Sequence, residues 1–210
     1  MPLQNRVNPF SKLIATLERG AWTGNRGVIH NENKEIVRNY AVKYWITCAL
    51  NYKDFRRSVM SPNRWTELFF LDEATAFAAG HRPCGFCRNA DFKLFKKLWI
   101  SANGDQYGFT STTSMPLIDA VIHRERLTEN GSQKTFTAIL ATLPDGTFIT
   151  LGEKNKALLW FQQNLYEWSF GGYSKVELFD KDQLVDVLTP LSYVAVFKKG
   201  YVPQVHGLGI

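Results

Sequence analysis

The sequence has few cysteines and no long run of apolar residues. No apolar stretch approaches the roughly 18 residues that a membrane-spanning helix needs, so we expect no membrane partner. The N-terminal segment also lacks the continuous apolar core of a secretory signal. Three cysteines are too few for a disulfide framework, and their odd number is typical of a reducing compartment. We therefore expect a cytoplasmic protein.

Common nucleotide-binding signatures are missing as well. The glycines form neither a P-loop nor a dinucleotide-binding fingerprint, and the chain has no internal repeat or low-complexity run. What the chain does have is 210 residues, of which 45% are hydrophobic and 14% aromatic. This composition indicates a globular protein with a sizeable core and argues against extended disorder.

The positive charge is confined to one half of the chain. The formal net charge is +6. Residues 1–105 contain 16 Lys and Arg against 9 Asp and Glu, a net charge of +7, whereas residues 106–210 contain 9 against 10, a net charge of −1. A basic half of this kind is expected to face a polyanion such as DNA, although a solvated surface with a chance imbalance explains it too.

The same position is where we expect a domain boundary. The segment 101–114 is rich in small, polar and turn-forming residues, and the charge changes there. We predict a basic domain at 1–105 and a C-terminal domain at 106–210, with two subdomains packed as one unit as the alternative.

Residue patterns predict a mixture of strands and helices. Predicted strands cover residues 43–52, 134–143, 147–151 and 184–188. Predicted helices cover the end of 66–79, then 91–100, 115–127 and 192–199. Pro144-Asp-Gly146 predicts a β-hairpin between the second and third strands. The fold class is α+β.

The motif that points most directly to chemistry is a pair of cysteines, Cys84 and Cys87. Two thiolates separated by two residues can bind one tetrahedral zinc ion, and a turn containing Gly and Pro before a helix is where such a knuckle is expected. A redox dithiol has the same spacing, but the sequence does not show the strand-then-helix context of a thioredoxin-like site. The neighbouring Arg82 and Arg88 would stabilise thiolates in either case.

Around these cysteines the sequence resembles the zinc-binding domain of Ada, the bacterial alkylation-response protein. The likeness covers residues 66–90, where a helix reading Glu73-Ala-Thr-Ala-Phe-Ala-Ala-Gly80 leads into Arg82-Pro-Cys-Gly-Phe-Cys87. The resemblance implies a small α/β zinc domain that contacts the DNA backbone, with Cys84 and Cys87 as ligands. The C-terminal half resembles a group of uncharacterised bacterial proteins and implies no activity.

The remaining zinc ligands differ from those of the Ada family, which supplies two further cysteines upstream. This chain has one, Cys48, which we predict to be the third ligand. We predict His30 as the fourth ligand, with His81 as the alternative. Because the family's methyl-accepting cysteine has no full counterpart, we expect a structural zinc ion rather than methyl transfer.

Candidate catalytic residues lie on the predicted helix 115–127. Asp119 and His123 are four residues apart, so they share one helical face, and a carboxylate beside an imidazole is a common acid–base arrangement. His81 is the third candidate, to be tested by whether it converges with them on one cleft. An exposed ion pair on a surface helix is the alternative for Asp119 and His123.

Candidate DNA contacts come from the basic half. Asn25 and Arg26 lie between Gly24 and Gly27, in a loop whose backbone can approach a phosphate closely, although an ordinary turn explains it nearly as well. The other predicted contacts are Arg57, Arg82 and Arg88.

Three functions from different classes fit these features. The first is a DNA-processing enzyme of the glycosylase type, acting in repair or antiviral defence, in which Asp119 activates water or stabilises the sugar cation and His123 assists. The second is a zinc DNA-binding or regulatory module without activity. The third is a small-molecule hydrolase with a structural zinc ion.

Overall fold

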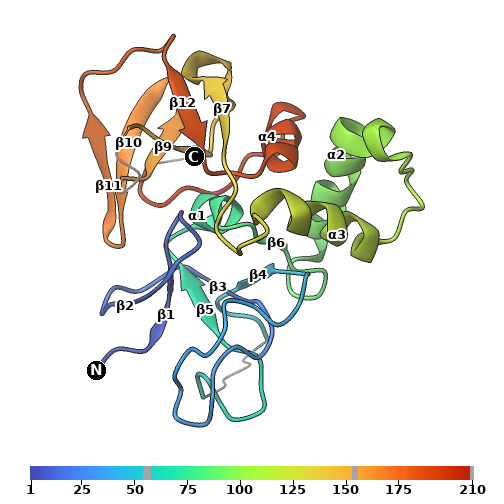
Figure 1. Cartoon of the computed structure of the whole chain (residues 1–210), viewed down its shortest axis with the longest axis vertical. Coiled ribbons are helices and arrows are strands. Elements are labelled where there is room, and N and C mark those ends of the chain that lie inside the picture. Colours follow the sequence, from blue (N-terminus) through green and yellow to red (C-terminus); the bar gives the residue numbers. More distant parts are fainter. Residues whose placement is uncertain (54–57, 153–155, 209–210) are drawn as a thin grey trace.

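The computed structural model describes residues 1–53, 58–152 and 156–208. Within these residues the chain forms two six-stranded sheets and four α-helices, which confirms the predicted α+β class. In Figure 1 the sheet of the first half lies at the bottom and the sheet of the second half at the top, with the helix α1 (Glu73–Ala78) between them.

The first sheet has the strand order β2-β1-β5-β3-β4-β6. Its strands are β1 (Gln4–Val7), β2 (Leu13–Ala15), β3 (Trp22–Asn25), β4 (Ile46–Ala49), β5 (Leu68–Phe70) and β6 (Arg82–Pro83). The pairs β1–β5 and β4–β6 are parallel, and the other neighbours are antiparallel. The parallel β4–β6 pair brings the segment around Cys48 beside the segment that leads to Cys84.

The second sheet has the order β11-β10-β9-β8-β12-β7 and is antiparallel throughout. Its strands are β7 (Phe136–Ile139), β8 (Thr147–Thr150), β9 (Leu158–Phe161), β10 (Asn164–Ser169), β11 (Gly172–Val176) and β12 (Leu184–Val187).

The predicted hairpin between residues 134–143 and 147–151 is wrong, because β12 lies between β7 and β8. The short 3₁₀ helix Leu140–Thr142 ends β7 before the turn is reached. The Pro-Asp-Gly turn instead faces β9: the Gly146 amide donates to the Trp160 carbonyl, and the Asp145 carboxylate accepts from the Gln162 amide.

The predicted helices are found close to their expected positions. Besides α1 they are α2 (Asn89–Tyr107), α3 (Met115–Arg126) and α4 (Leu191–Lys198). The helix α1 begins at Asp72, whose carboxylate accepts from the Thr75 amide, and ends before Gly80, which has a φ of +82°. The helix α2 is nine residues longer than predicted, because apolar contacts continue along one side of it.

All four helices contribute to one hydrophobic cluster. Phe77 of α1 is fully buried among aromatic and aliphatic side chains of the other three helices and of Tyr201. The members are Phe77, Phe95, Trp99, Ile118, Val121, Ile122, Tyr193, Val196, Phe197 and Tyr201. The boundary predicted near residue 105 therefore falls inside α2, and residues from both predicted domains contribute to this core.

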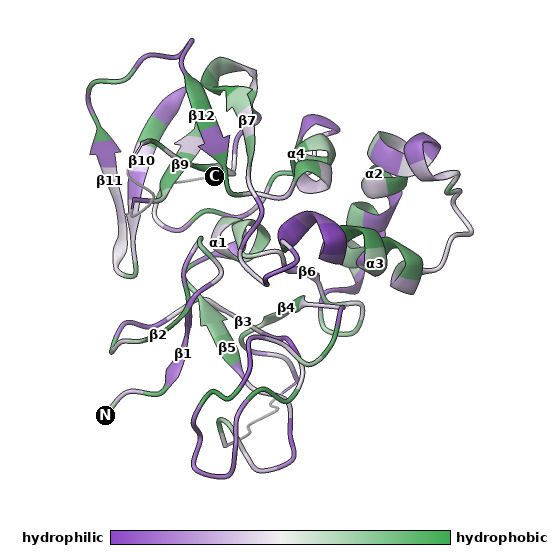
Figure 2. Cartoon of the chain, viewed as in Figure 1, coloured by the Kyte–Doolittle hydropathy of each residue, from purple (hydrophilic) through white to green (hydrophobic). Residues whose placement is uncertain are grey.

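The helix α1 is buried on every side. Ala74 and Ala78 pack against the second sheet, whereas Ala76 and Ala79 pack against the first. A helix without a solvent-exposed face is stable only when neighbours cover its whole surface, and alanine lets both sheets approach closely. The helix α3 differs: Figure 2 shows its surface becoming hydrophilic toward its C-terminal end. In the described parts of the chain, no helix is both long and apolar enough to cross a membrane.

A buried ion pair connects the first sheet to α3. The Arg82 guanidinium of β6 donates from Nε and Nη2 to the two carboxylate oxygens of Asp119, both at 2.7 Å. The two side chains are 8% and 7% exposed, so solvent screens the pair little. The pair positions the segment that precedes Cys84.

Asp119→Asn is expected to destabilise the fold by about 3–5 kcal/mol, because it leaves the Arg82 cation buried without its counter-charge. The free energy of unfolding in urea measures this loss. Glu167→Gln is the matched control, since it breaks the exposed pair with Lys156 and should cost at most ~1 kcal/mol. Equal losses in the two variants would contradict a special role for the buried pair.

Candidate metal centre

The three cysteines of the chain come together at the edge of the first sheet. In the β4–β6 register Ile46 lies opposite Arg82 and Thr47 opposite Pro83. The pairing continues past β6, where the Cys84 amide donates to the Thr47 carbonyl at 2.8 Å. The next residue after Thr47 is Cys48, so backbone hydrogen bonding fixes Cys48 beside Cys84.

The chain then turns sharply and brings Cys87 to the same place. The Arg88 amide donates to the Cys84 carbonyl at 3.1 Å, which closes the turn, and the Phe86 amide donates to the Cys84 sulfur at 3.4 Å. Amides aimed at a cysteine sulfur stabilise the thiolate that a metal requires. A short strand precedes this turn and α2 follows it, so the strand-then-helix context is present after all; Cys48, however, makes the site a three-thiol cluster.

The ligand atoms of Cys48, Cys84 and Cys87 all lie within 4.8 Å of one another. A tetrahedral ion with metal–sulfur bonds of about 2.3 Å needs sulfurs about 3.8 Å apart, so the cluster requires only a small contraction to close on one ion. Three thiol groups are the donor set that zinc and other soft or borderline metals favour. The three cysteines can therefore hold a metal ion.

The sulfurs also polarise one another. The hydrogen bond from the Cys48 thiol lowers the pKa of Cys84 to about 5 and lowers the pKa of Cys87, while it raises the pKa of Cys48 itself. Backbone amides of Phe86 and Ala49 lower the pKa values of Cys84 and Cys87, respectively, still further. Cys84 is therefore a thiolate near neutral pH, and a bound cation would displace the proton that Cys48 keeps.

His30, predicted as the fourth ligand, is not part of the cluster. Its Nδ1 atom is 2.6 Å from the Thr66 hydroxyl and its Nε2 atom 3.2 Å from the Ser61 carbonyl, so both ring nitrogens have partners elsewhere. Among the described residues, no histidine or carboxylate joins the three cysteines. The sequence alone could not show that His30 lies away from the cysteines, because His30 is in a loop whose path depends on tertiary contacts.

The alternative ligand, His81, is also away from the cluster. Its side chain is fully buried against Trp45 and Phe70, and its Nε2 atom accepts a hydrogen bond from Arg26 at 3.2 Å. Burial, followed by the charges of Arg26 and Arg126, holds the pKa of His81 well below its ordinary value. His81 is thus a neutral imidazole in the protein interior.

The expected acid–base pair of Asp119 and His123 is not formed. Asp119 is buried with both oxygens bound to Arg82, whereas the Nδ1 atom of His123 lies 2.8 Å from Nη2 of Arg126. A guanidinium nitrogen can only donate, so Nδ1 accepts. The two side chains share a helical face but have separate partners, and Asp119 is not free to activate water.

Most of the predicted DNA contacts are buried in the protein. Asn25 is 4% exposed, and its side-chain oxygen accepts from the Gly27 amide. Arg82 is occupied by Asp119, as described above. Arg57 lies outside the described residues. Asn25 and Arg82 therefore owe their positions to packing rather than to a solvent-facing surface.

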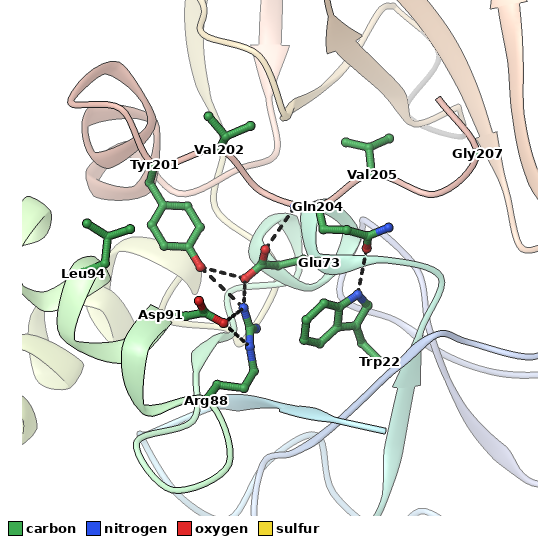
Figure 3. Close-up of a pocket in the computed structure, with 10 residues that line it drawn as sticks. All are labelled: Trp22, Glu73, Arg88, Asp91, Leu94, Tyr201, Val202, Gln204, Val205 and Gly207. Atoms are coloured by element: carbon green, nitrogen blue, oxygen red, sulfur yellow. Dashed lines mark hydrogen bonds and ion pairs between the residues drawn. The ribbon is translucent and has the colours of Figure 1, made fainter. Parts of the chain in front are cut away.

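Arg88 belongs to a buried network that lines a cavity of about 720 Å³ (Figure 3). Its guanidinium forms ion pairs with Glu73 and Asp91 and lies over the Trp22 ring, 4.1 Å from the ring centroid. The Tyr201 hydroxyl donates to Glu73 at 2.8 Å. Two carboxylates neutralise the Arg88 cation, so Arg88 joins α1 to α2 instead of facing a phosphate.

Arg26 is also buried, but its surroundings are different. It is 1% exposed and donates to Ser11 and to His81, none of which carries a negative charge. Its guanidinium lies 4.1 Å from the centroid of the Trp45 ring, and that of Arg126 lies 3.7 Å from it. Sequence reasoning did not single out Trp45 or Arg126, because neither occurs in a recognisable motif.

Comparisons with known family models, with curated proteins and with solved structures found no match for this chain.

The geometry predicts one metal ion per chain. Purified under reducing conditions, the protein should contain about one equivalent of transition metal by elemental analysis, and Cys48→Ser, Cys84→Ser and Cys87→Ser should each lose most of it. His30→Gln is the matched control and should keep the metal. Loss of metal in His30→Gln, or full retention in Cys48→Ser, would contradict the three-cysteine cluster.

The lowered pKa of His123 leads us to expect that the stability of the protein depends on pH. Burial, followed by the charges of Arg126 and Lys43, lowers its pKa to about 4. The unfolded chain binds a proton as the pH falls below about 6.5 and the folded chain does not, so the contribution of this residue to stability decreases between about pH 6.5 and pH 4.

In urea titrations across that range, the free energy of unfolding should fall less steeply with decreasing pH in His123→Gln than in the unmodified protein. The reason is that the variant lacks the uptake of up to one proton by His123 on unfolding. His206→Gln, which removes an exposed histidine, serves as the control. An unchanged pH dependence in His123→Gln would show that the imidazole titrates as it does in the unfolded chain.

Proposed function

We propose that this chain is a zinc-containing, DNA-binding protein. The observation that carries the proposal is the convergence of Cys48, Cys84 and Cys87, whose donor set fits Zn²⁺. The resemblance of residues 66–90 to the zinc-binding domain of Ada and the positive charge of residues 1–105 support the same conclusion. The zinc ion would fix the turn between β6 and α2 and would itself carry out no reaction.

The turn that holds the cysteines presents an exposed aromatic ring. Phe86, between Cys84 and Cys87, is 74% exposed and makes an edge contact with Tyr52 at a centroid distance of 5.3 Å. The Lys53 ammonium lies 5.5 Å from the Tyr52 ring. An exposed ring beside a cation is suited to stacking on an unpaired base and contacting its phosphate.

The helix that follows the turn carries further exposed positive charge. Lys93 and Lys97 are exposed and four residues apart on α2, which begins two residues after Cys87. We call Tyr52, Lys53, Phe86, Lys93 and Lys97 the knuckle surface. It replaces Asn25, Arg82 and Arg88 as the proposed site of DNA contact, because those three side chains are buried.

Of the functions considered, a binding module fits these contacts better than a glycosylase. In the glycosylase mechanism Asp119 would need a free carboxylate, and here Arg82 binds both of its oxygens. A small-molecule hydrolase with structural zinc would show no affinity for DNA at moderate salt, and the binding experiment below separates it from the module.

Phe86→Ala should weaken binding of a fluorescently labelled single-stranded oligonucleotide by about 5- to 100-fold, because stacking on one base contributes about 1–3 kcal/mol. Fluorescence anisotropy measures the affinity. Leu178→Ala, which truncates an exposed apolar side chain of the C-terminal half, is the control and should leave the affinity unchanged.

The double variant Lys93→Gln/Lys97→Gln should reduce the slope of log affinity against log salt by about 1.4, because each phosphate contact on a single strand contributes about 0.7. Lys198→Gln/Lys199→Gln removes two exposed charges from the other half and should leave the slope unchanged. Failure of the unmodified, metal-loaded protein to bind DNA at low salt would contradict the proposal.

A further inference from the structure

The interior next to the first sheet holds more positive charge than its carboxylates balance. Three arginines, Arg26, Arg82 and Arg126, are buried there, at 1%, 7% and 3% exposure. Asp119 is the buried carboxylate among them, and Arg82 binds both of its oxygens. Arg26 and Arg126 have no ion-pair partner among the described residues.

The two remaining guanidinium groups lie close together. Both are near the Trp45 ring, which places their central carbons within about 8 Å of each other. Arg126 donates to the carbonyls of Gly80 and Lys43 and to Nδ1 of His123, and its Nε atom has no partner. Every acceptor around the pair is therefore neutral.

Burying two like charges without an anion is unfavourable, because charged groups in protein interiors are ordinarily paired. Burial, followed by the neighbouring guanidinium, lowers the pKa of Arg26, and burial lowers the pKa of Arg126 to about 10. Groups with strongly perturbed pKa values that lie in a cleft are candidates for a functional site.

A cleft gives access to this charge from outside. It has a volume of about 570 Å³, within the range of small-molecule sites, and Arg26 and Trp45 are part of its lining. Lys12, an exposed cation, also lines it, and Asp186 of β12 is the one carboxylate among the lining residues described. Hydroxyl and amide groups of Asn39, Ser132, Thr135 and Thr150 line it as well.

The cleft lies where the two halves of the chain meet. One wall comes from the first sheet and the loop after Val7, and the other from the segment after α3 and from the second sheet. This location is common for ligand sites, because two units can contribute polar groups to one ligand.

We propose that this cleft binds the phosphate group of a phosphate monoester, with the Arg26 guanidinium as the main contact and the Trp45–Arg126 pair behind it. Arginine matches the geometry of phosphate oxygens with two parallel N–H donors. The second positive charge would strengthen attraction for a dianion, and the apolar and hydroxyl groups of the walls would contact the organic part. The site is separate from the knuckle surface and does not depend on it.

Burial favours a terminal phosphate over one inside a nucleic-acid strand. Arg26 lines the cleft and is only 1% exposed, so we expect a ligand to enter with its phosphate first. A terminal phosphate can do so, whereas an internal phosphodiester carries a nucleoside on both sides. The experiment therefore compares these two sources of the same chemical group.

The test uses the full chain loaded with metal. Side-chain Nε–H signals of arginine are followed by ¹⁵N NMR while inorganic phosphate, a deoxynucleoside 5′-monophosphate or a hydroxyl-ended oligonucleotide is added. The proposal predicts saturable shifts of the Arg26 signal with the monophosphate and with phosphate. Shifts with the oligonucleotide alone would overturn the assignment to a monoester, and no shift with any of the three would overturn the site.

Arg26→Gln should weaken monophosphate binding by roughly 10- to 100-fold, as expected for loss of a charge-assisted hydrogen bond. Arg124→Gln removes an exposed arginine two residues from Arg126 and is the matched control. Should Arg26→Gln fail to fold, Lys12→Gln, at an exposed position of the lining, is predicted to weaken binding by a smaller factor. Equal affinities in the Arg124→Gln and lining variants would overturn the proposal.

Discussion

The fold depends on one continuously buried segment, residues 70–84, in which every residue is shielded from solvent. It leaves the first sheet through β5, forms α1 between the two sheets, and returns to the first sheet as β6. Because α1 has no solvent-exposed face, both sheets and the helical core must be in place for it to be stable. The segment ends at Cys84, so packing of this segment fixes one of the three cysteines that could hold a metal ion. The three thiols converge because β6 is held between β4 on one side and the Arg82–Asp119 ion pair on the other.

Two groups of buried arginines serve different purposes in this interior. Arg82 and Arg88 are balanced by carboxylates and join elements that are distant in sequence, β6 to α3 and α1 to α2. Arg26 and Arg126 are not balanced; both lie against the Trp45 ring, and Arg26 and Trp45 line a cleft. The ion pairs of Arg82 and Arg88 add little net stability, because the cost of removing the charges from water offsets much of their attraction. We connect these pairs with the specificity of the fold. Unbalanced charges of the second kind cost stability, and we therefore connect them with ligand binding.

Much of this arrangement could be predicted from the sequence, and the exceptions have physical reasons. Local residue patterns predict the helices and the strand around Cys48. Ligand chemistry predicts that Cys48 lies close to Cys84 and Cys87. The hairpin at Pro144-Asp-Gly146 was wrong because strand pairing depends on contacts with β12, about forty residues further along the chain. The structure gives His30, Asp119, Arg82 and Arg88 other partners than those predicted, for a related reason. The sequence alone does not show whether a polar side chain is free to bind a ligand or is already bonded to a buried partner. Asp119 is bonded to Arg82 and His30 to Thr66.

The central claim is that three cysteine sulfurs bind one zinc ion, and X-ray absorption spectroscopy of the metal as purified tests it most directly. The account predicts a zinc edge and a first shell with three sulfur atoms at about 2.3 Å, together with one further ligand that the described cysteines do not supply. A spectrum with fewer than three sulfur neighbours, or a shell made up mainly of nitrogen and oxygen, would contradict it.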